Sequence, residues 1–313
     1  MNCWRQRALA LLGAIALDLA LGEPPNRFHP VVWMGRAVGR LEKMAPPNGN
    51  ARPLAYGAAC ELLCLGAAAG VAGLLERLAF RFPAPLGIAI GAVLLKPAFS
   101  IRALFSSVER VGRALGDGDL GAARHQLSRI VSREVAQLDE GQVVAAAVES
   151  LAENASDSVV APALAFALLG LPGAYGYRMA NTLDAMWGYR GQYEQLGKAA
   201  ARVDDLLNLV PARLAALLVA AGSGLAQGSP RDAMAAAWRD AGLPASPNAG
   251  WPMAAAAGGL DIRLEKVDHY VLNPDGRLPG AEHIGRAQTA VAGGLALFLA
   301  SMTVVLWRWD RDC

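Results

Sequence analysis

The chain has 313 residues, of which 54% are hydrophobic and 18% are charged, and its formal net charge is +2. Soluble domains carry roughly 25% charged residues, so this composition argues against an ordinary soluble domain, and the small net charge argues against a nucleic-acid-binding surface. The four cysteines form no CxxC pair and no histidine-rich cluster accompanies them, which argues against a disulfide scaffold or a zinc site.

Apolar segments recur along the chain. The first, residues 5–22, begins with two arginines like a signal peptide, but Asp18 interrupts it and no A-x-A cleavage site comes after it. We therefore expect it to be retained as a first helix. Other candidates to cross a hydrocarbon core of about 30 Å are residues 56–78, 84–105, 206–226 and 287–307. Residues 143–171 are apolar at both ends but carry carboxylates between them, so they either span or enter and return.

Polar segments at about 106–142, 173–205 and 227–286 alternate with these apolar segments. The interleaving predicts a single integral membrane domain over residues 1–313. We expect an all-α, polytopic helical membrane protein with about four to six spanning or re-entrant helices and polar helical loops. Nearly every apolar segment carries an ionisable residue, which costs roughly 2.5–3.5 kcal/mol in a membrane unless it is paired or hydrated. This pattern predicts a polar cavity among the helices.

The segment "RHQLSRIVSRE", residues 124–134, is the first of several polar constellations. His125, Arg129 and Arg133 recur at i, i+4 and i+8, which would align them on one face of a helix. Two guanidinium groups and an imidazole on one stripe suit a phosphate or several carboxylates. The alternative is an exposed, charged helix.

The segment "ESLAENASD", residues 149–157, repeats the spacing with Glu149, Glu153 and Asp157. On a continuous helix, three stacked carboxylates repel one another unless a metal ion or arginines neutralise them, or unless their pKa values rise. The flanking residues are apolar, so a solvated face does not explain the pattern. We interpret this segment as functional.

The segment "YRMANTLDAMWGYR", residues 177–190, is amphipathic when it is read as a helix. Tyr177, Asn181 and Asp184 fall on one side, and Met179 and Leu183 fall on the other. An amide and a carboxylate three residues apart can hold Mg²⁺, which prefers oxygen ligands. The alternative is a solvated surface helix.

Two further motifs carry polar groups. In "ARVDDLLNLVPAR", residues 201–213, Asp204, Asp205 and Asn208 precede an apolar run, and an N-cap role explains one aspartate but not both. "SPNAGWPMAAAAGG", residues 246–259, can open a helix at Pro247, whose free amides can bind an anion. The chain has no G-x-x-x-x-G-K-[ST], G-x-S-x-G or H-E-x-x-H motif.

Taken in their order along the chain, these motifs resemble those of the adenosylcobinamide-phosphate synthases, which are integral membrane proteins of cobalamin biosynthesis. The resemblance runs from about Asp18 to Leu260 and departs at Ser158, where the family has glycine. The stretches that carry it are "HPVVWMGR", "ARHQLSRIVSRE", "ESLAENASDSVVAPALAFALLGLPGA", "YRMANTLDAMWGYR", "ARVDDLLNLVPARL" and "SPNAGWPMAAAAGGL".

The resemblance implies a ligase that uses ATP and Mg²⁺. Such an enzyme joins the free propionate of adenosylcobyric acid to the amine of (R)-1-amino-2-propanol or its O-phosphate, which gives adenosylcobinamide or its phosphate. It implies a multi-pass protein of the bacterial cytoplasmic (inner) membrane whose active loops face the cytoplasm. Its implied partners are these substrates, the lipid bilayer and other corrinoid-assembly enzymes, but no nucleic acid.

The matched motifs also imply site residues. The implied catalytic residues are His125, Glu149, Glu153 and Asp184. The implied ligands of Mg²⁺ are Glu149, Glu153, Asp157, Asp184, Asp204 and Asp205. The residues implied to bind substrate or phosphate are His29, Arg129, Arg133, Asn154, Tyr177, Arg178, Asn181, Arg202, Asn208, Arg213 and Asn248.

Two other functions remain open on the sequence. A membrane prenyltransferase also holds Mg²⁺-diphosphate on helical aspartates, and "NTLD" with "DDLLN" faintly resembles such a pair. A non-catalytic corrinoid transporter or assembly platform would fit the apolar run at 206–226, which Pro211 interrupts. The several carboxylates and arginine ladders in the polar segments favour an enzyme over a transporter.

Overall fold

The computed structural model describes residues 3–47, 52–189, 191 and 193–309, and these residues are predominantly helical. The all-α prediction is confirmed: the only described strands form one antiparallel hairpin, in which β1 (Leu264–Lys266) pairs with β2 (Tyr270–Leu272). The chain divides into two compact units, and each is assembled from separate stretches of sequence. The single domain expected from the sequence stays a prediction.

The first unit comprises Met1–Ile101, Ala161–Leu207 and Ser301–Cys313. Within it, α1 packs along α4, while α9 packs against α3, α8, α10 and α2. Its helices are α1 (Cys3–Leu21), α2 (Pro30–Glu42), α3 (Arg52–Ala79), α4 (Ala84–Leu95), the 3₁₀ turn η1 (Lys96–Ala98), α8 (Ala161–Leu169), α9 (Leu171–Trp187) and α10 (Lys198–Leu207).

The second unit comprises Arg102–Val160 and Asn208–Ala300. Its core is formed by α7 and α13, whose alanine-rich faces are almost entirely buried, with α11 and α12 packed on α13 and β1 packed on α7. Its elements, besides the hairpin, are α5 (Ile101–Gly116), α6 (Leu120–Leu127), α7 (Glu140–Ala155), the π-helix η2 (Ser156–Val160), α11 (Leu209–Ser223), the 3₁₀ turn η3 (Gly224–Ala226), α12 (Pro230–Asp240), α13 (Gly250–Leu260) and α14 (Glu282–Arg308), whose last turns belong to the first unit.

Small residues set the close spacing of these helices. A Cβ atom at Gly258 of α13 would collide with the backbone carbonyl of Asp232 in α12, so only glycine permits this approach. Close backbone approach through small residues is typical of membrane helices, because lipid provides no hydrophobic force that drives helices together. The sequence contains 34 glycines and only 6% aromatic residues, a composition that fits this close packing of helices.

Four of the described helical stretches are long and apolar enough to cross a membrane: Arg52–Ala79, Ala84–Gly116, Leu209–Ala226 and Glu282–Arg308. They coincide with the spans predicted from the sequence at 56–78, 84–105, 206–226 and 287–307, so a polytopic helical membrane protein is confirmed. The first predicted segment is helical as α1, and residues 143–171 are helical over most of their length. Neither is among the four stretches.

A buried ion pair connects α1 with α3 beside a glycine. Nε of Arg7 donates to Oε1 of Glu76 at 3.1 Å, with both side chains about nine-tenths buried. Gly170 lies between α8 and α9 with φ +74°, and a Cβ atom there would collide with both charged groups. Its backbone conformation is one that essentially only glycine adopts.

We predict that Gly170→Ala lowers the stability of the protein by about 1–3 kcal/mol for backbone strain alone, with a further cost from displacing the Arg7–Glu76 pair. The loss should appear as a lower thermal midpoint in detergent. Gly118→Ala is the matched control, since Gly118 also has φ +74° but has open space around it. Equal losses in the two variants would show that the ion pair does not require glycine at this position.

Candidate functional site

An acidic cluster lies in the first unit where α9 packs against α10. Asp184 of α9 faces Asp204 and Asp205 of α10, and burial together with these two carboxylates raises the pKa of Asp184 to about 7. Nδ2 of Asn181 donates to Oδ1 of Asp204 at 3.4 Å. The structure thus brings together two motifs that are separate in the sequence, and it places their carboxylates against one another.

Cationic side chains border this cluster. Nη1 of Arg178 donates to Oδ1 of Asn181 at 3.4 Å. Burial raises the pKa of Asp205, and the exposed guanidinium of Arg202 opposes that rise. Tyr177 is buried in the helix packing. Carboxylates flanked by arginines can hold a cation and the phosphates that accompany it.

Glu61 joins the cluster from α3 and was not among the site residues predicted from the sequence. Its side chain is only 2% exposed, and neither carboxylate oxygen has a hydrogen-bond partner among the described residues. It interacts electrostatically with Asp184 and Asp204. The signal available in the sequence was a glutamate inside a predicted span, where a charge is expensive.

A second cluster, in the second unit, surrounds Glu149 of α7. Arg133 forms an ion pair with Glu149, which is 2% exposed. Burial raises the pKa of Glu149, while Arg133, Lys266 and the hydroxyl of Tyr270 oppose the rise. The hairpin β1–β2 supplies Lys266 and Tyr270. Neither was predicted, because no periodicity in the sequence connects the hairpin with α7.

The continuous stack predicted for Glu149, Glu153 and Asp157 is interrupted. The α-helix ends at Ala155, and Asp157 lies in the π-helix Ser156–Val160. A π-turn inserts an additional residue and so rotates the side chains beyond it around the helix axis, and such turns are frequent at functional sites. Asn154 donates to the carbonyl of Ser150 at 2.9 Å, within its own helix.

The prediction that His125, Arg129 and Arg133 lie on one face of a continuous helix is wrong. Helix α6 ends at Leu127, where the hydroxyl of Ser128 donates to the carbonyl of His125 at 2.9 Å. Such local bonds from serine compete with helix continuation. His125 and Arg129 are exposed, and of the three predicted residues only Arg133 reaches the Glu149 cluster.

The last two motifs meet in the second unit. Nη1 of Arg213 in α11 donates to Oδ1 of Asn248 at 3.0 Å, and its guanidinium lies 4.9 Å from the ring centre of Trp251. Asn208 is buried at the start of α11. The helix start predicted at Pro247 is wrong: α13 begins at Gly250, after a turn in which Ser246 accepts from the backbone of Asn248.

His29 has a structural role at the start of α2. Its Nδ1 accepts from the backbone N–H of Val31 at 3.2 Å, and its Nε2 lies 2.9 Å from Glu23. Both ring nitrogens are therefore engaged inside the first unit. This arrangement favours a helix cap over the substrate- or phosphate-binding role that the motifs implied for His29.

The carboxylates fit a metal that arrives with a nucleotide. Within the described ranges, no group of three His, Cys, Asp or Glu side chains is arranged to hold a metal ion. Mg²⁺ usually takes one or two carboxylates, and water molecules and substrate phosphates complete its shell. The repulsion that raises the pKa of Asp184 is the kind that a cation relieves, so Asp184 with Asp204 and Asp205 fits this requirement best.

Comparison with known proteins gives a consistent result. The family described as CobD/Cbib protein matches residues 11–295. The cobalamin biosynthesis protein CobD of Dehalococcoides mccartyi is 42% identical over 268 residues, which cover 85% of this chain and 87% of the relative. The protein of the same name in Rhodobacter capsulatus is 40% identical over 316 residues and 96% of each chain. No solved structure matches.

We predict a pH-dependent stability that originates at Asp184. Because its pKa is raised to about 7, the folded protein binds a proton more tightly there than the unfolded chain, so the free energy of unfolding falls as the pH rises through 7. Thermal midpoints measured with EDTA should therefore be higher at about pH 5 than at about pH 8, and Asp184→Asn should flatten this difference.

The same variant tests cation binding. Adding Mg²⁺ at about pH 8 should raise the thermal midpoint of the unmodified protein and not that of Asp184→Asn, since a ligand that binds only the folded state stabilises it. An identical response of both proteins to Mg²⁺ would contradict this assignment.

We predict that Tyr270→Phe costs about 1–2 kcal/mol of stability, because it removes a hydroxyl from a buried carboxylate. Tyr193→Phe is the matched control: the hydroxyl of Tyr193 donates to Oε1 of Glu42 at 2.6 Å, and both residues belong to the first unit, whereas Glu149 belongs to the second. Thermal midpoints in detergent provide the measurement. If Tyr270→Phe lost no more stability than Tyr193→Phe, the hydroxyl of Tyr270 would not contribute to the Glu149 cluster.

Proposed function

The chain belongs to the CobD/Cbib family of cobalamin biosynthesis proteins, and we propose that it is the ligase that forms the amide bond of adenosylcobinamide or its phosphate. In this proposal, the free propionate of adenosylcobyric acid is joined to the amine of (R)-1-amino-2-propanol or of its O-phosphate. ATP with Mg²⁺ drives the reaction. The observation that carries the proposal is the acidic cluster of α9 and α10, bordered by arginines, in a chain of this family.

Amide formation from a carboxylate needs activation, since the carboxylate itself is a poor electrophile. ATP would transfer its terminal phosphoryl group to the propionate and leave as ADP, and the amine would then displace inorganic phosphate from the acyl phosphate. One or two of the carboxylates of Asp184, Asp204 and Asp205 would hold the Mg²⁺ that accompanies the nucleotide. Arg178 and Arg202 border these carboxylates and would pair with phosphate oxygens, where positive charge stabilises the charge that develops during transfer.

The attacking amine has to be neutral, so a proton acceptor is required. In the second unit, Glu149 is committed to Arg133, whereas Glu153 is only half-buried and interacts with Tyr270. The matched motifs imply a catalytic role for Glu153, which is therefore our candidate for accepting the proton. His125 is exposed and stays a candidate for the same role.

The location of the reaction depends on its substrates. ATP and the corrinoid precursor are cytosolic, so the polar segments that carry the motifs would face the cytoplasm from the inner membrane. The remaining implied contacts, Arg129, Asn154, Asn208, Arg213 and Asn248, would then meet substrate from that side. Other corrinoid-assembly enzymes would hand over or receive the corrinoid there.

The deciding assay uses the purified protein in lipid nanodiscs. It is incubated with adenosylcobyric acid, ATP, Mg²⁺ and each amine in turn, and the corrinoid product is identified by mass spectrometry. The expected result is adenosylcobinamide with the free amino alcohol or its phosphate ester with the phosphorylated one. If the protein formed no amide with either amine but consumed labelled prenyl diphosphate, it would be a prenyltransferase instead.

We predict that Asp184→Asn abolishes ATP-dependent amide formation and leaves the protein folded in the membrane, because the amide cannot supply the negative charge that Mg²⁺ requires. A decrease of about 100-fold or more is the magnitude expected when a preorganised charge contact to the transition state is lost. Asp117→Asn, at an exposed position outside both clusters, should retain the activity. Full turnover by Asp184→Asn would overturn the metal-ligand role.

A further inference from the structure

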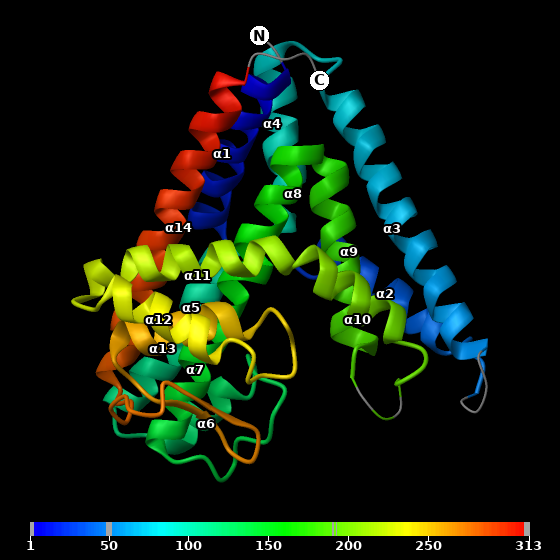
Figure 1. Ribbon diagram of the computed structural model, residues 1–313. Helices are drawn as coiled ribbons and strands as arrows, with labels where there is room; N and C mark the ends of the chain where they lie inside the picture. Colours follow the sequence, from blue (N-terminus) through cyan, green and yellow to red (C-terminus); the bar gives the residue numbers. More distant parts are fainter. Residues whose placement is uncertain (1–2, 48–51, 190, 192, 310–313) are drawn as a thin grey trace. The chain divides into compact units, whose positions relative to one another are not determined.

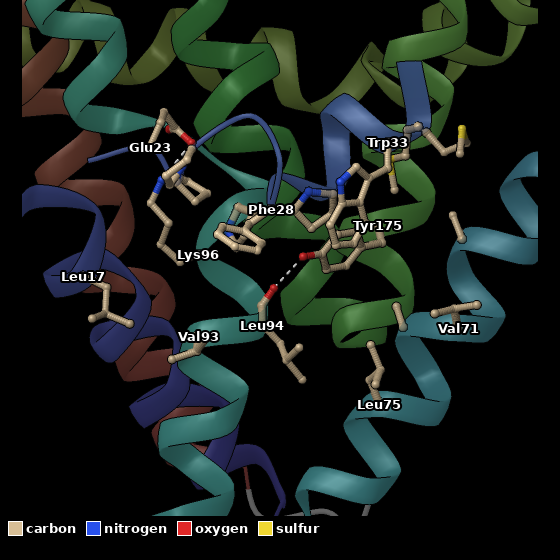
Figure 2. A pocket seen from close by; sticks show the side chains of 18 of the residues that line it. Leu17, Glu23, Phe28, Trp33, Val71, Leu75, Val93, Leu94, Lys96 and Tyr175 are labelled. Carbon is tan, nitrogen blue, oxygen red and sulfur yellow. Dashed lines mark hydrogen bonds and ion pairs between the residues drawn. The ribbon is translucent and has the colours of Figure 1, made fainter. Parts of the chain in front are cut away.

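The first unit contains a cavity of about 880 Å³, within the roughly 300–1,000 Å³ range of ligand-binding pockets. Five helices of that unit, α1, α2, α3, α4 and α9, contribute to its wall. Figure 2 shows Val71 and Leu75 of α3 across the cavity from Leu17 and Val93 of α1 and α4. The cavity does not include the carboxylates assigned to the proposed reaction.

The wall of the cavity is apolar over most of its extent. The hydroxyl of Tyr175 donates to the carbonyl of Leu94 at 2.6 Å, so these two polar groups satisfy each other and offer little to a ligand. Large apolar side chains remain exposed along the wall: Val71 and Val93 are each 60% exposed. Leaving such surface in water costs roughly 25 cal/mol per Å², so the wall suits a hydrocarbon.

Two of the wall helices are candidate membrane spans, namely α3 and the stretch Ala84–Gly116 that begins with α4. The medium beside the cavity is therefore the bilayer, and lipid chains are the hydrocarbon available to it. A small polar molecule would leave most of this volume unfilled. A corrin substituted with amides would leave those amides without hydrogen-bond partners against the apolar wall.

One end of the cavity is charged. Nζ of Lys96 lies 3.0 Å from Oδ1 of Asp18 and 2.9 Å from Oε2 of Glu23. Nε2 of His29 lies 2.9 Å from the same Oε2. Glu23 and Lys96 are the charged residues that line the cavity, and Figure 2 shows them side by side. Both contacts of Glu23 use Oε2, so its Oε1 has no partner among the described residues.

We propose that this cavity binds a membrane phospholipid whose headgroup carries a primary ammonium. The acyl chains lie against the apolar wall, and the ammonium donates a hydrogen bond to Oε1 of Glu23. Charge supports this headgroup over an anionic one, because the acceptor that remains at the charged end is a carboxylate oxygen, Oε1 of Glu23. A primary ammonium also has N–H donors, which a trimethylammonium lacks.

The test compares three phospholipids with identical acyl chains, which carry ethanolamine, choline or glycerol headgroups. The delipidated full-length protein is incubated with an equal mixture of the three, and the lipid retained is measured by native mass spectrometry. We expect the ethanolamine lipid to be enriched about tenfold over each of the others, as one charge-assisted hydrogen bond allows. Equal retention of the three lipids would overturn the proposal.

Variants locate the site. Val71→Trp should obstruct part of the apolar wall and reduce the enrichment. Leu74→Trp is its matched control, since Leu74 is on the same helix and equally exposed at 59% but does not line the cavity. Glu23→Gln should remove the headgroup preference while retaining bound lipid. Size-exclusion chromatography and thermal midpoints establish that each variant is folded.

Two outcomes would reject this ligand. If Val71→Trp and Leu74→Trp retained the ethanolamine lipid equally, the lipid would bind elsewhere. If free amino alcohol displaced the lipid at millimolar concentration, the cavity would belong to a soluble amine. The readout is lipid retention and needs no turnover, so it stands independently of the proposed reaction.

Discussion

The rest of this structure depends on one constraint: an apolar helical chain has to accommodate its ionisable side chains. A charge taken out of water is costly unless an opposite charge or a set of hydrogen bonds compensates it. The chain meets this requirement with long-range pairs: Arg7 with Glu76 joins α1 to α3, and Lys96 with Asp18 joins η1 to α1.

The two acidic clusters meet the constraint differently. Around Glu149, an arginine, a lysine and a tyrosine hydroxyl surround one deeply buried carboxylate. Between α9 and α10, by contrast, Asp184 faces two further aspartates, and Glu61 adds a fourth carboxylate from α3. The first arrangement is balanced by an arginine, a lysine and a hydroxyl of the chain itself, whereas the second brings carboxylates together and raises the pKa of Asp184.

The sequence anticipated those features that depend on local periodicity. The amphipathic stripe that separates Asn181 and Asp184 from Met179 and Leu183 is observed, because one helix contains all four residues. The four long apolar stretches were predicted from the length of their apolar runs, which is also a local feature of the sequence. The prediction that His125, Arg129 and Arg133 share one helix face was wrong, because residue spacing does not indicate where a helix ends. Helix α6 ends at Leu127, with Ser128 as its C-cap. Glu61 and Tyr270 could not be assigned, since their partners lie more than a hundred residues away in the chain.

Charge balance therefore narrows the candidate ligands of Mg²⁺ beyond what the sequence allowed. A metal ion bound at Glu149 would have to displace Arg133 from a buried pair and leave that guanidinium uncompensated, which typically costs several kcal/mol. A cation at Asp184 displaces no such partner and relieves the repulsion that raises the pKa of this residue. Between Glu149 and Asp184, charge balance therefore favours Asp184 as the ligand of the Mg²⁺ that we propose.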